Sequence, residues 1–191
     1  GMRLLSESGG VTVTVVKRAM QRAPVFEFAS AREARDFGQW LVEHGDAIRA
    51  AAESTTRIGK LTDVEQYALG NLLYTRFNYT TGDAAGQNMT GKATFVACEW
   101  IRKNYPGGAH YILSGNMDTD KKHSRVNMLV TRGKRVVAEA TIKGELLKSL
   151  MGIDAKTLFW ARQISNTGAF LAGSANNGAH AANGLTAMFI A

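Results

Sequence analysis

The chain has 191 residues, of which 45% are hydrophobic and 20% charged, and its 23 Lys and Arg against 16 Asp and Glu give a net charge of +7. This composition excludes a disordered chain, and no stretch approaches the roughly 18 consecutive apolar residues of a membrane span. Residues 1–30 lack the basic-then-apolar layout of a signal peptide. A single cysteine, Cys98, excludes a disulfide framework. We therefore expect a soluble, cytoplasmic protein without a membrane-spanning segment.

The positive charge favours an anionic partner. Nucleic acid, a membrane surface and a phosphate-rich small molecule would each satisfy it. The basic residues are not interleaved with aromatic side chains as in proteins that bind single strands, which disfavours nucleic acid. The histidines lack the spacing of a metal-ligand motif, so we expect no metal.

The first half of the chain predicts strands around a helical region. Residues 11–16 are alternating β-branched residues that follow a Gly-Gly turn, and this pattern predicts a strand. Residues 25–28 predict a second extended segment. Ser30 and Glu33 have the spacing of a capping box for a helix from Ala31, which Gly45 interrupts before 47–52 continue helically. The apolar positions of that helix are Ala34, Phe37, Leu41 and Val42. Residues 69–80 predict a strand with one apolar face that carries Leu73, Thr75, Phe77 and Tyr79.

The second half predicts a long helix followed by shorter elements. The apolar stripe of the helix consists of Met89, Ala93, Val96, Trp100 and Ile101. Residues 111–113 predict a strand, and 128–130 with 135–142 predict a hairpin around 132–134. The remainder predicts helices with glycine-rich joints. Strands interleaved with helices, without regular βαβ repetition, predict an α+β fold.

One segment suited to chemistry is the glycine-rich turn and helix start over 80–92. Unpaired N–H groups and the helix dipole favour an anion there, such as a pyrophosphate. The spacing matches neither G-x-G-x-x-G nor G-x-x-x-x-G-K-[ST]. An ordinary turn at Gly82, with Asp83 as a helix cap, is the alternative.

Two further segments combine polar groups. Residues 114–125 carry hydroxyl, amide, carboxylate and ammonium groups, and a lysine oriented by Asp120 would stabilise a carbonyl oxygen that gains negative charge. A solvated surface loop is the alternative. In residues 173–183, the spacing of His180 and Asn183 would place both side chains on one helix face. The alternative is that His180 has only a structural role. Cys98 lies in the long helix and is expected to be packed rather than nucleophilic.

In order along the chain, three runs match motifs of one family. TGDAAGQNM at 81–89, SGNMDTDKK at 114–122 and AHAANGLTAMFIA at 179–191 resemble the cofactor motif, the catalytic lysine loop and the start of the central helix of hydroxymethylglutaryl-CoA reductase, in its class I form. Weaker matches at 22–25 and 54–57 fall where the family has them. The sequence departs from the family's Met-rich cofactor motif at Ala85 and Gln87, so we expect contacts through the backbone there.

The resemblance implies NADPH-dependent reduction of hydroxymethylglutaryl-CoA to mevalonate and CoA by two hydride transfers, with NADP(H) as the cofactor. Lys121 would stabilise the developing oxyanion with Asp120 beside it, and Asn183 would hydrogen-bond in the catalytic centre. The implied substrate-binding residues are Arg22, Ser114, Asn116 and Lys122. The implied cofactor-binding residues are Thr56, Arg57, Asp83, Gly86, Gln87, Asn88 and Met89. Arg57 would favour NADPH over NADH, because a dianionic phosphate suits a forked cation.

The resemblance also implies an organisation. A small NAD(P)-binding domain, 24–112, would be inserted into a larger substrate domain with a central helix, represented by 1–23 and 113–191, and the protein would be a homodimer with interfacial active sites. The family's upstream catalytic Glu and downstream Asp and His are not matched, so we expect the central portion of a reductase, inactive in isolation. The alternative is a shortened, noncatalytic relative that binds only nucleotide or a partner chain.

Overall fold

The computed structural model describes residues 1–174 and 181–190 of the chain. They form two compact units, one of Gly1–Thr14 with Val137–Ala191 and one of Val15–Val136. The chain combines helices with an antiparallel sheet, which confirms the predicted α+β fold. The unit Val15–Val136 contains the whole range 24–112, and the domain boundaries at 24 and 112 stay a prediction.

The sheet is organised around β4 (Leu72–Tyr79). Along one edge of β4, β2 (Val25–Glu27) pairs with Leu72–Tyr74 and β1 (Thr12–Arg22) pairs with Phe77–Tyr79, and both pairs are antiparallel. Pro24 separates the two partners, and its carbonyl accepts a hydrogen bond from the Thr75 amide at 2.9 Å. This change of partner leaves Arg22 at the end of a strand.

The other strands complete the sheet. β3 (Leu61–Leu69) pairs with the second edge of β4, β5 (His110–Ile112) pairs with β2, and β6 (Gly133–Glu139) pairs with β1. The strand order of the described chain is therefore β5-β2-β4-β1-β6, with β3 also on β4. The predicted strands at 11–16, 25–28, 69–80 and 111–113 are confirmed, whereas β3 was not predicted.

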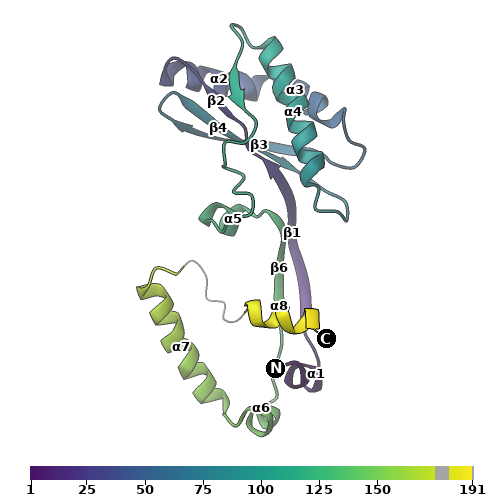
Figure 1. The fold of residues 1–191 in the computed structure, drawn as a ribbon, viewed down its shortest axis with the longest axis vertical. Coiled ribbons are helices and arrows are strands. Elements are labelled where there is room, and N and C mark those ends of the chain that lie inside the picture. Colours follow the sequence, from purple (N-terminus) through teal and green to yellow (C-terminus); the bar gives the residue numbers. More distant parts are fainter. Residues whose placement is uncertain (175–180, 191) are drawn as a thin grey trace. The chain divides into compact units, whose positions relative to one another are not determined.

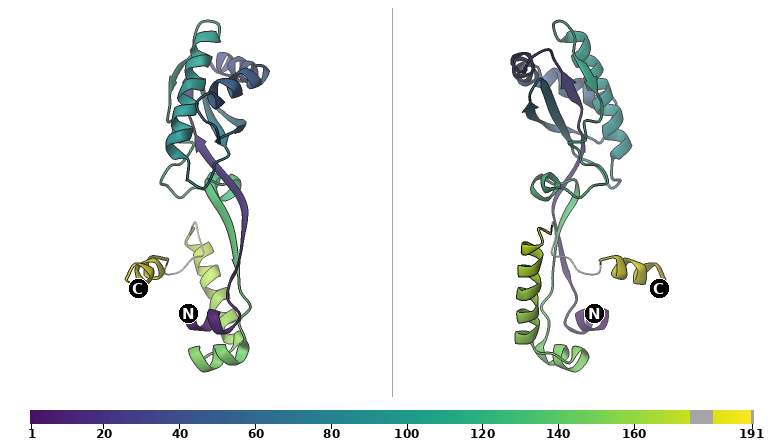
Figure 2. Two further views of the ribbon diagram at one scale, coloured as in Figure 1. Left: turned by 90° about the vertical axis from the view of Figure 1, so that its right-hand side faces the viewer. Right: turned by 60° about the vertical axis from the view of Figure 1, so that its left-hand side comes forward.

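The core of the unit Val15–Val136 lies between the sheet and three helices, α2 (Ala31–Glu43), α3 (Gly45–Glu53) and α4 (Gln87–Asn104) (Figures 1 and 2). The predicted inner face of β4 is confirmed, because Leu73, Thr75, Phe77 and Tyr79 are all buried. The opposite face of β4 also buries Arg76 and Asn78. Alternation alone does not predict that second buried layer.

Helix α2 begins as predicted and then differs in one position. The Ser30 hydroxyl accepts from the Glu33 amide at 3.2 Å, while the Glu33 carboxylate accepts from the Ala29 amide, one residue before the cap, at 3.3 Å. Three of its four predicted apolar positions are buried, but Val42 is 67% exposed. Leu41 already faces the sheet, and the next residue lies about 100° further around the helix.

The strand predicted over 135–142 is confirmed as β6, but its predicted hairpin with 128–130 is wrong. Arg125–Val130 is a helix, α5, because the Ser124 hydroxyl caps it by accepting from the Asn127 amide at 3.1 Å. The chain then turns at Thr131, with a positive φ of 79°, and enters β6, whose partner is β1. The short apolar run Met128–Val130 fits a strand and a helix equally well, so periodicity alone does not predict α5.

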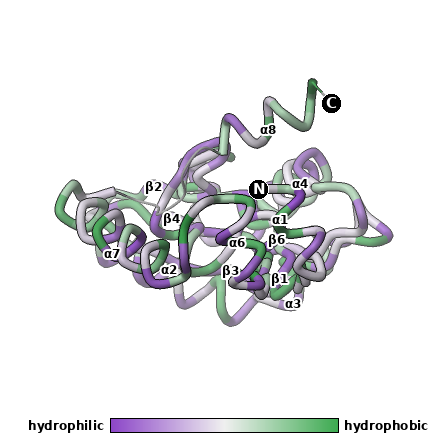
Figure 3. The backbone as a smooth tube through the Cα atoms, turned by 90° about the horizontal axis from the view of Figure 1, so that it is seen from below, coloured by the Kyte–Doolittle hydropathy of each residue, from purple (hydrophilic) through white to green (hydrophobic). Residues whose placement is uncertain are grey.

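The other unit contains α6 (Gly144–Met151), α7 (Ala155–Leu171) and α8 (Ala181–Ile190), which confirm the predicted helices of the remainder. It also contains α1 (Met2–Glu7), which was not predicted. Leu4 and Leu147 are buried where α1 contacts α6. No residue of α7 is buried. The end of α8 is hydrophobic (Figure 3), and its side chains Met188, Phe189 and Ile190 are exposed. Among the described residues, no helix is long and apolar enough to cross a bilayer.

Candidate functional site

The glycine-rich turn leads into α4 through Gly86 rather than Asp83. Gly86 is the N-cap residue with a φ of +81°, and a Cβ there would lie 2.6 Å from Cγ2 of Thr81, so glycine is required on both counts. No side chain caps the helix, and its hydrogen-bond ladder begins with the Thr90 amide on the Gly86 carbonyl at 3.0 Å. The first-turn N–H groups are left for solvent or a ligand. The alternative in which Asp83 caps the helix is wrong.

Next to this turn lies a recess of about 380 Å³. Residues 55–59, Thr81, Gly82, Asp83, Ala84, Gly86 and Met89 line it. It therefore brings the segment after α3 against the turn before α4. The Thr56 hydroxyl fixes the first segment by accepting from the Gly59 amide at 3.0 Å, and Arg57 is exposed.

Five of the seven predicted cofactor residues meet at this recess: Thr56, Arg57, Asp83, Gly86 and Met89. Gln87 and Asn88 do not line it and lie exposed on the first turn of α4. An exposed guanidinium, uncapped N–H groups and apolar side chains such as Ile58 and Met89 suit an anionic ligand with an apolar portion.

The lysine loop is fastened to the sheet where it begins. The Gly115 amide donates to the Ala23 carbonyl at 2.6 Å, and a Cβ on Gly115 would lie 2.8 Å from Cβ of Val25. Only glycine allows this approach, which brings Ser114 close in space to the end of β1 and Arg22. Of the predicted substrate residues, Ser114 and Arg22 thus come together.

Three loop residues have a left-handed backbone that is uncommon outside glycine: Asn116 (φ 71°), Thr119 (φ 51°) and Lys121 (φ 57°). The Lys122 ammonium stabilises the loop by donating to Oδ1 of Asn116 at 3.1 Å and to the Asp120 carbonyl at 3.3 Å. The Lys121 ammonium is exposed and makes no hydrogen bond or ion pair with the described part of the chain. It is a loop cation left open for a ligand.

The Asp120 carboxylate is hydrogen-bonded to two residues outside the loop and not to its neighbour Lys121. Its Oδ2 accepts from Nε2 of Gln87 at 2.8 Å, and its Oδ1 accepts from Nη2 of Arg132 at 3.0 Å. Desolvation opposes ionisation, but the hydrogen bond from Arg132, the charges of Arg132 and Lys121, and the bond from Gln87 outweigh it and lower the pKa of Asp120. Asp120 therefore stays ionised beside Lys121.

Two charged residues, one within the loop and one after it, were not among the predicted site residues. Asp118 is fully buried, its carboxylate oxygens have no hydrogen-bond partner, and Oδ2 lies 3.6 Å from Nη1 of Arg22. Arg132, whose side chain is 9% exposed, binds Asp120. The sequence places Arg132 at the turn of the predicted hairpin, because no local pattern links it to a carboxylate twelve residues earlier.

The remaining predicted groups lie elsewhere. Asn183 lies in α8 of the other unit, and His180 lies outside the described residues. Cys98 is buried in α4, where desolvation raises the pKa of its thiol, so the prediction of a packed cysteine is confirmed. Within 1–174 and 181–190, no group of three or more His, Cys, Asp or Glu could hold a metal ion.

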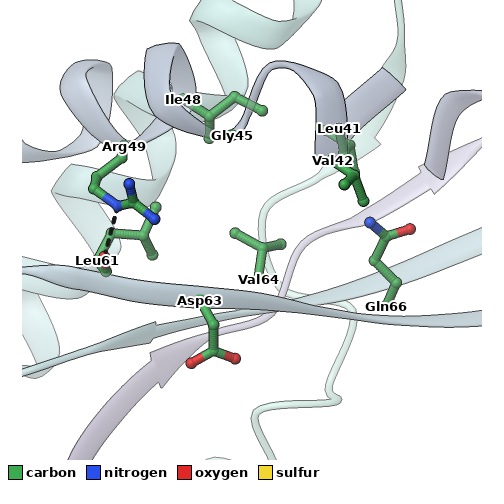
Figure 4. Close-up of a pocket in the computed structure, with 9 residues that line it drawn as sticks. All are labelled: Leu41, Val42, Gly45, Ile48, Arg49, Leu61, Asp63, Val64 and Gln66. Carbon is green, nitrogen blue, oxygen red and sulfur yellow. Dashed lines mark hydrogen bonds between the residues drawn. The ribbon is translucent and has the colours of Figure 1, made fainter. Parts of the chain in front are cut away.

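A smaller hollow of about 120 Å³, between α2, α3 and β3, offers no comparable chemistry (Figure 4). Its polar side chains already have partners: Arg49 donates to the Leu61 carbonyl at 3.2 Å, and Gln66 donates to the Gly38 carbonyl at 3.0 Å. Asp63 points away from the hollow and accepts from Asn78 at 2.9 Å. The recess beside α4 and the lysine loop are therefore the candidate site.

Comparison with known proteins gives consistent matches over the whole chain. The family model of hydroxymethylglutaryl-coenzyme A reductase matches residues 1–191. The 3-hydroxy-3-methylglutaryl-coenzyme A reductases of Methanothermobacter thermautotrophicus and Aeropyrum pernix are 41% identical over 194 residues and 38% identical over 193 residues. Each alignment covers 100% of this chain but 48% and 46% of those proteins, so the chain spans about half their length.

A solved structure shows the same fold. The class II 3-hydroxy-3-methylglutaryl-CoA reductase from Streptococcus pneumoniae, bound to NADPH in open conformations, superposes with a TM-score of 0.56 over 86% of this chain and 41% of that chain. The two sequences are 17% identical in that alignment, so the likeness concerns the fold alone.

Proposed function

Because the chain belongs to the hydroxymethylglutaryl-coenzyme A reductase family, we propose that it supplies the cofactor site and the substrate-polarising lysine of an enzyme that reduces hydroxymethylglutaryl-CoA to mevalonate and CoA with NADPH. One observation carries the proposal. The loop that holds the exposed Lys121 is hydrogen-bonded, through Asp120, to the first residue of the helix that borders the recess. The two groups that such a reaction must bring together are thus structurally connected.

The recess suits NADP(H). The uncapped first turn of α4 and the close approach allowed by Gly86 suit a pyrophosphate, and Arg57 with Thr56 suit the adenosine 2′-phosphate. Asp83 and Met89 would line the dinucleotide, and Gln87 and Asn88 would contribute backbone N–H groups. The bound cofactor supplies the hydride for the reduction of the thioester carbonyl carbon.

Lys121 would donate a hydrogen bond to the substrate carbonyl oxygen. The negative charge on that oxygen grows during hydride addition, so an ammonium aimed at it stabilises the transition state more than the ground state. The Lys121 ammonium is not engaged by the described residues, and Asp120 keeps a negative charge beside it. Asn183 would add a hydrogen bond in the catalytic centre.

The substrate's free carboxylate would be held near the start of the loop. Arg22 and Lys122 supply cations, and Ser114 and Asn116 supply a hydroxyl and an amide. The tight Gly115–Ala23 contact supports this assignment, because it brings Ser114 close to Arg22. A homodimer with interfacial sites, a cytoplasmic location and an NAD(P)-binding domain at 24–112 belong to the same proposal.

Cofactor choice tests the site directly. Calorimetric titration of the chain should show NADPH binding at least ~10-fold tighter than NADH, since loss of a charge-assisted phosphate contact costs roughly 1.5–3 kcal/mol. Arg57→Gln should abolish most of the preference. Arg32→Gln, an exposed arginine on α2, is the matched control and should preserve it. Equal affinities for the two nucleotides in the unmodified chain would remove the role of Arg57.

Turnover tests the rest of the proposal. In a reductase polypeptide that includes this chain, Lys121→Met should lower kcat by ~10²–10³-fold in an NADPH oxidation assay with hydroxymethylglutaryl-CoA. Residues 1–191 alone should bind NADPH without steady-state turnover. If the longer polypeptide binds NADPH but never oxidises it with this substrate, the noncatalytic binding alternative is favoured.

A further inference from the structure

Asp120 joins three segments that are far apart in sequence. It lies in the lysine loop, Gln87 begins α4, and Arg132 directly precedes β6. Each carboxylate oxygen accepts one hydrogen bond, at 2.8 Å from Gln87 and at 3.0 Å from Arg132. We name this set, Gln87, Asp120 and Arg132, the carboxylate bridge. The proposed chemistry assigns no role to the Gln87 side chain or to Arg132.

Arg132 ties the carboxylate bridge to the sheet. Its Nη1 donates to the Gln21 carbonyl at 2.9 Å while its Nη2 binds Asp120. Gln21 is held in β1, opposite Asn78 of β4. A planar guanidinium fixes both contacts at once, since its nitrogens form a rigid fork. The Asp120 carboxylate is therefore positioned relative to the central strands.

The backbone of the lysine loop has a conformation that depends on contacts of this kind. Thr119 and Lys121, on either side of Asp120, have φ values of 51° and 57°. A left-handed backbone at non-glycine residues persists only where surrounding contacts determine it. The ammonium of Lys121 makes no such contact with the described residues, so the bonds of Asp120 and Lys122 hold the backbone from which Lys121 projects.

We propose that Arg132 and the side chain of Gln87 are positioning residues that hold Asp120, and through it the backbone of Lys121, in register with the first turn of α4. The inference rests on the proposed function for the role of Lys121, but the bridge itself does not. Gln87 replaces a methionine expected from the family resemblance, and methionine has no N–H to donate. This chain thus has a polar link between the cofactor recess and the lysine loop at that position.

The first experiment needs no activity. NMR on the chain would measure amide order parameters for residues 119–122 and the titration of the Asp120 carboxyl carbon. Arg132→Gln should lower the order parameters and raise the pKa of Asp120, and Arg132→Lys should restore order only in part, because one nitrogen replaces two. Arg135→Gln is the matched control, because Arg135 is an exposed arginine in β6 that, among the described residues, donates only to the Leu129 carbonyl.

Gln87→Met provides a second test of the carboxylate bridge if the Arg132 variants fail to fold. Gln87 is exposed, so its replacement should leave the unfolding midpoint unchanged while it raises the pKa of Asp120 by a smaller amount. If Arg132→Gln and Gln87→Met both match Arg135→Gln in order and in titration, the positioning role is overturned.

The second experiment uses a reductase polypeptide that contains the chain. Arg132→Gln should lower kcat by ~10–100-fold with less than about a threefold change in the NADPH dissociation constant, because a displaced reacting group impairs the chemical step. An unchanged kcat, or a loss confined to NADPH binding, would overturn the inference. If the unmodified polypeptide does not reduce hydroxymethylglutaryl-CoA, the proposed function fails while the NMR outcome still decides the bridge.

Discussion

The two units differ in how far they bury their apolar side chains. In the unit Val15–Val136, Phe26, Phe37 and Phe77 are fully buried between sheet and helices. In the other unit, Phe170 is 87% exposed and Phe189 is 90% exposed, and α7 has no buried residue. Periodicity therefore predicts that a helix forms, while only a packing partner decides whether its apolar face is covered. An exposed apolar surface of this kind is typical of an interface, in line with the proposed homodimer.

The largest expected effect contrasts one aromatic residue from each unit. Phe77→Ala should lower the free energy of unfolding by about 3–5 kcal/mol, because it removes a ring from a close-packed core. Phe189→Ala should change it by less than about 0.5 kcal/mol, because the ring is 90% exposed. Urea denaturation followed by circular dichroism measures both.

Similar losses from the two substitutions would break the comparison. They would mean that the face of α8 is covered in solution, for example by a second copy of the chain. Repeating the titration at several protein concentrations separates that case, since stability gained by association depends on concentration.

A buried hydrogen bond should have the next largest effect. The hydroxyls of Tyr79 and Thr94 lie 2.9 Å apart in the core, and burial raises the pKa of Tyr79. Tyr79→Phe leaves the Thr94 hydroxyl without this partner and should cost about 1–2 kcal/mol in urea denaturation. Tyr67→Phe, on the partly exposed strand β3, is the control and should cost less than about 0.5 kcal/mol. Equal costs would show that β4 is less tightly covered than its burial indicates.

The sequence predicts the elements of the core well because their signals are local. Alternation over 69–80 predicts the buried face of β4, and the Ser30 cap predicts the start of α2. The strand β3 has no such signal, because its polar and apolar residues do not alternate regularly and its register shifts between Leu61 and Asp63, so pairing with β4 defines it. The hairpin was wrong for a related reason: the partner of β6 is β1, more than a hundred residues earlier.

The candidate site follows the same rule. The sequence predicts the glycine-rich turn before α4, because its signal is local. The recess needs the segment 55–59 to meet the start of α4, and the carboxylate bridge needs three distant side chains to meet. No spacing in the sequence relates Arg132 to Asp120 or Asp118 to Arg22. Contacts of that kind are set by the sheet that carries them.

The helix caps of the two units allow a further comparison, with an expected effect on the free energy of unfolding of about 1 kcal/mol. Ser30 caps α2 in one unit, and Asp154 caps α7 in the other by accepting from the Thr157 amide at 2.7 Å. Ser30→Ala should lower the free energy of the main unfolding transition by about 1 kcal/mol. Asp154→Ala should leave that transition unchanged, because α7 buries nothing that unfolds with the core. A shared shift would show that the two units unfold as one cooperative body.

The smallest expected effect concerns charge at the edge of the core. Glu53 accepts from Lys60 at 2.9 Å and from the Leu61 amide at 3.0 Å, and the bond from Lys60, followed by that from Leu61, lowers the pKa of Glu53 against desolvation. A lowered folded-state pKa means that ionised Glu53 stabilises the fold above its unfolded pKa of about 4.3 and that this stabilisation is lost as the pH falls through the folded value. Glu53→Gln should therefore cost less than about 1 kcal/mol at pH 7 and a smaller amount at pH 3 in urea denaturation. Glu43→Gln removes an equivalent charge from the exposed end of α2 and serves as the control. A cost for Glu53→Gln that is the same at both pH values would assign the effect to packing of the side chain rather than to its charge.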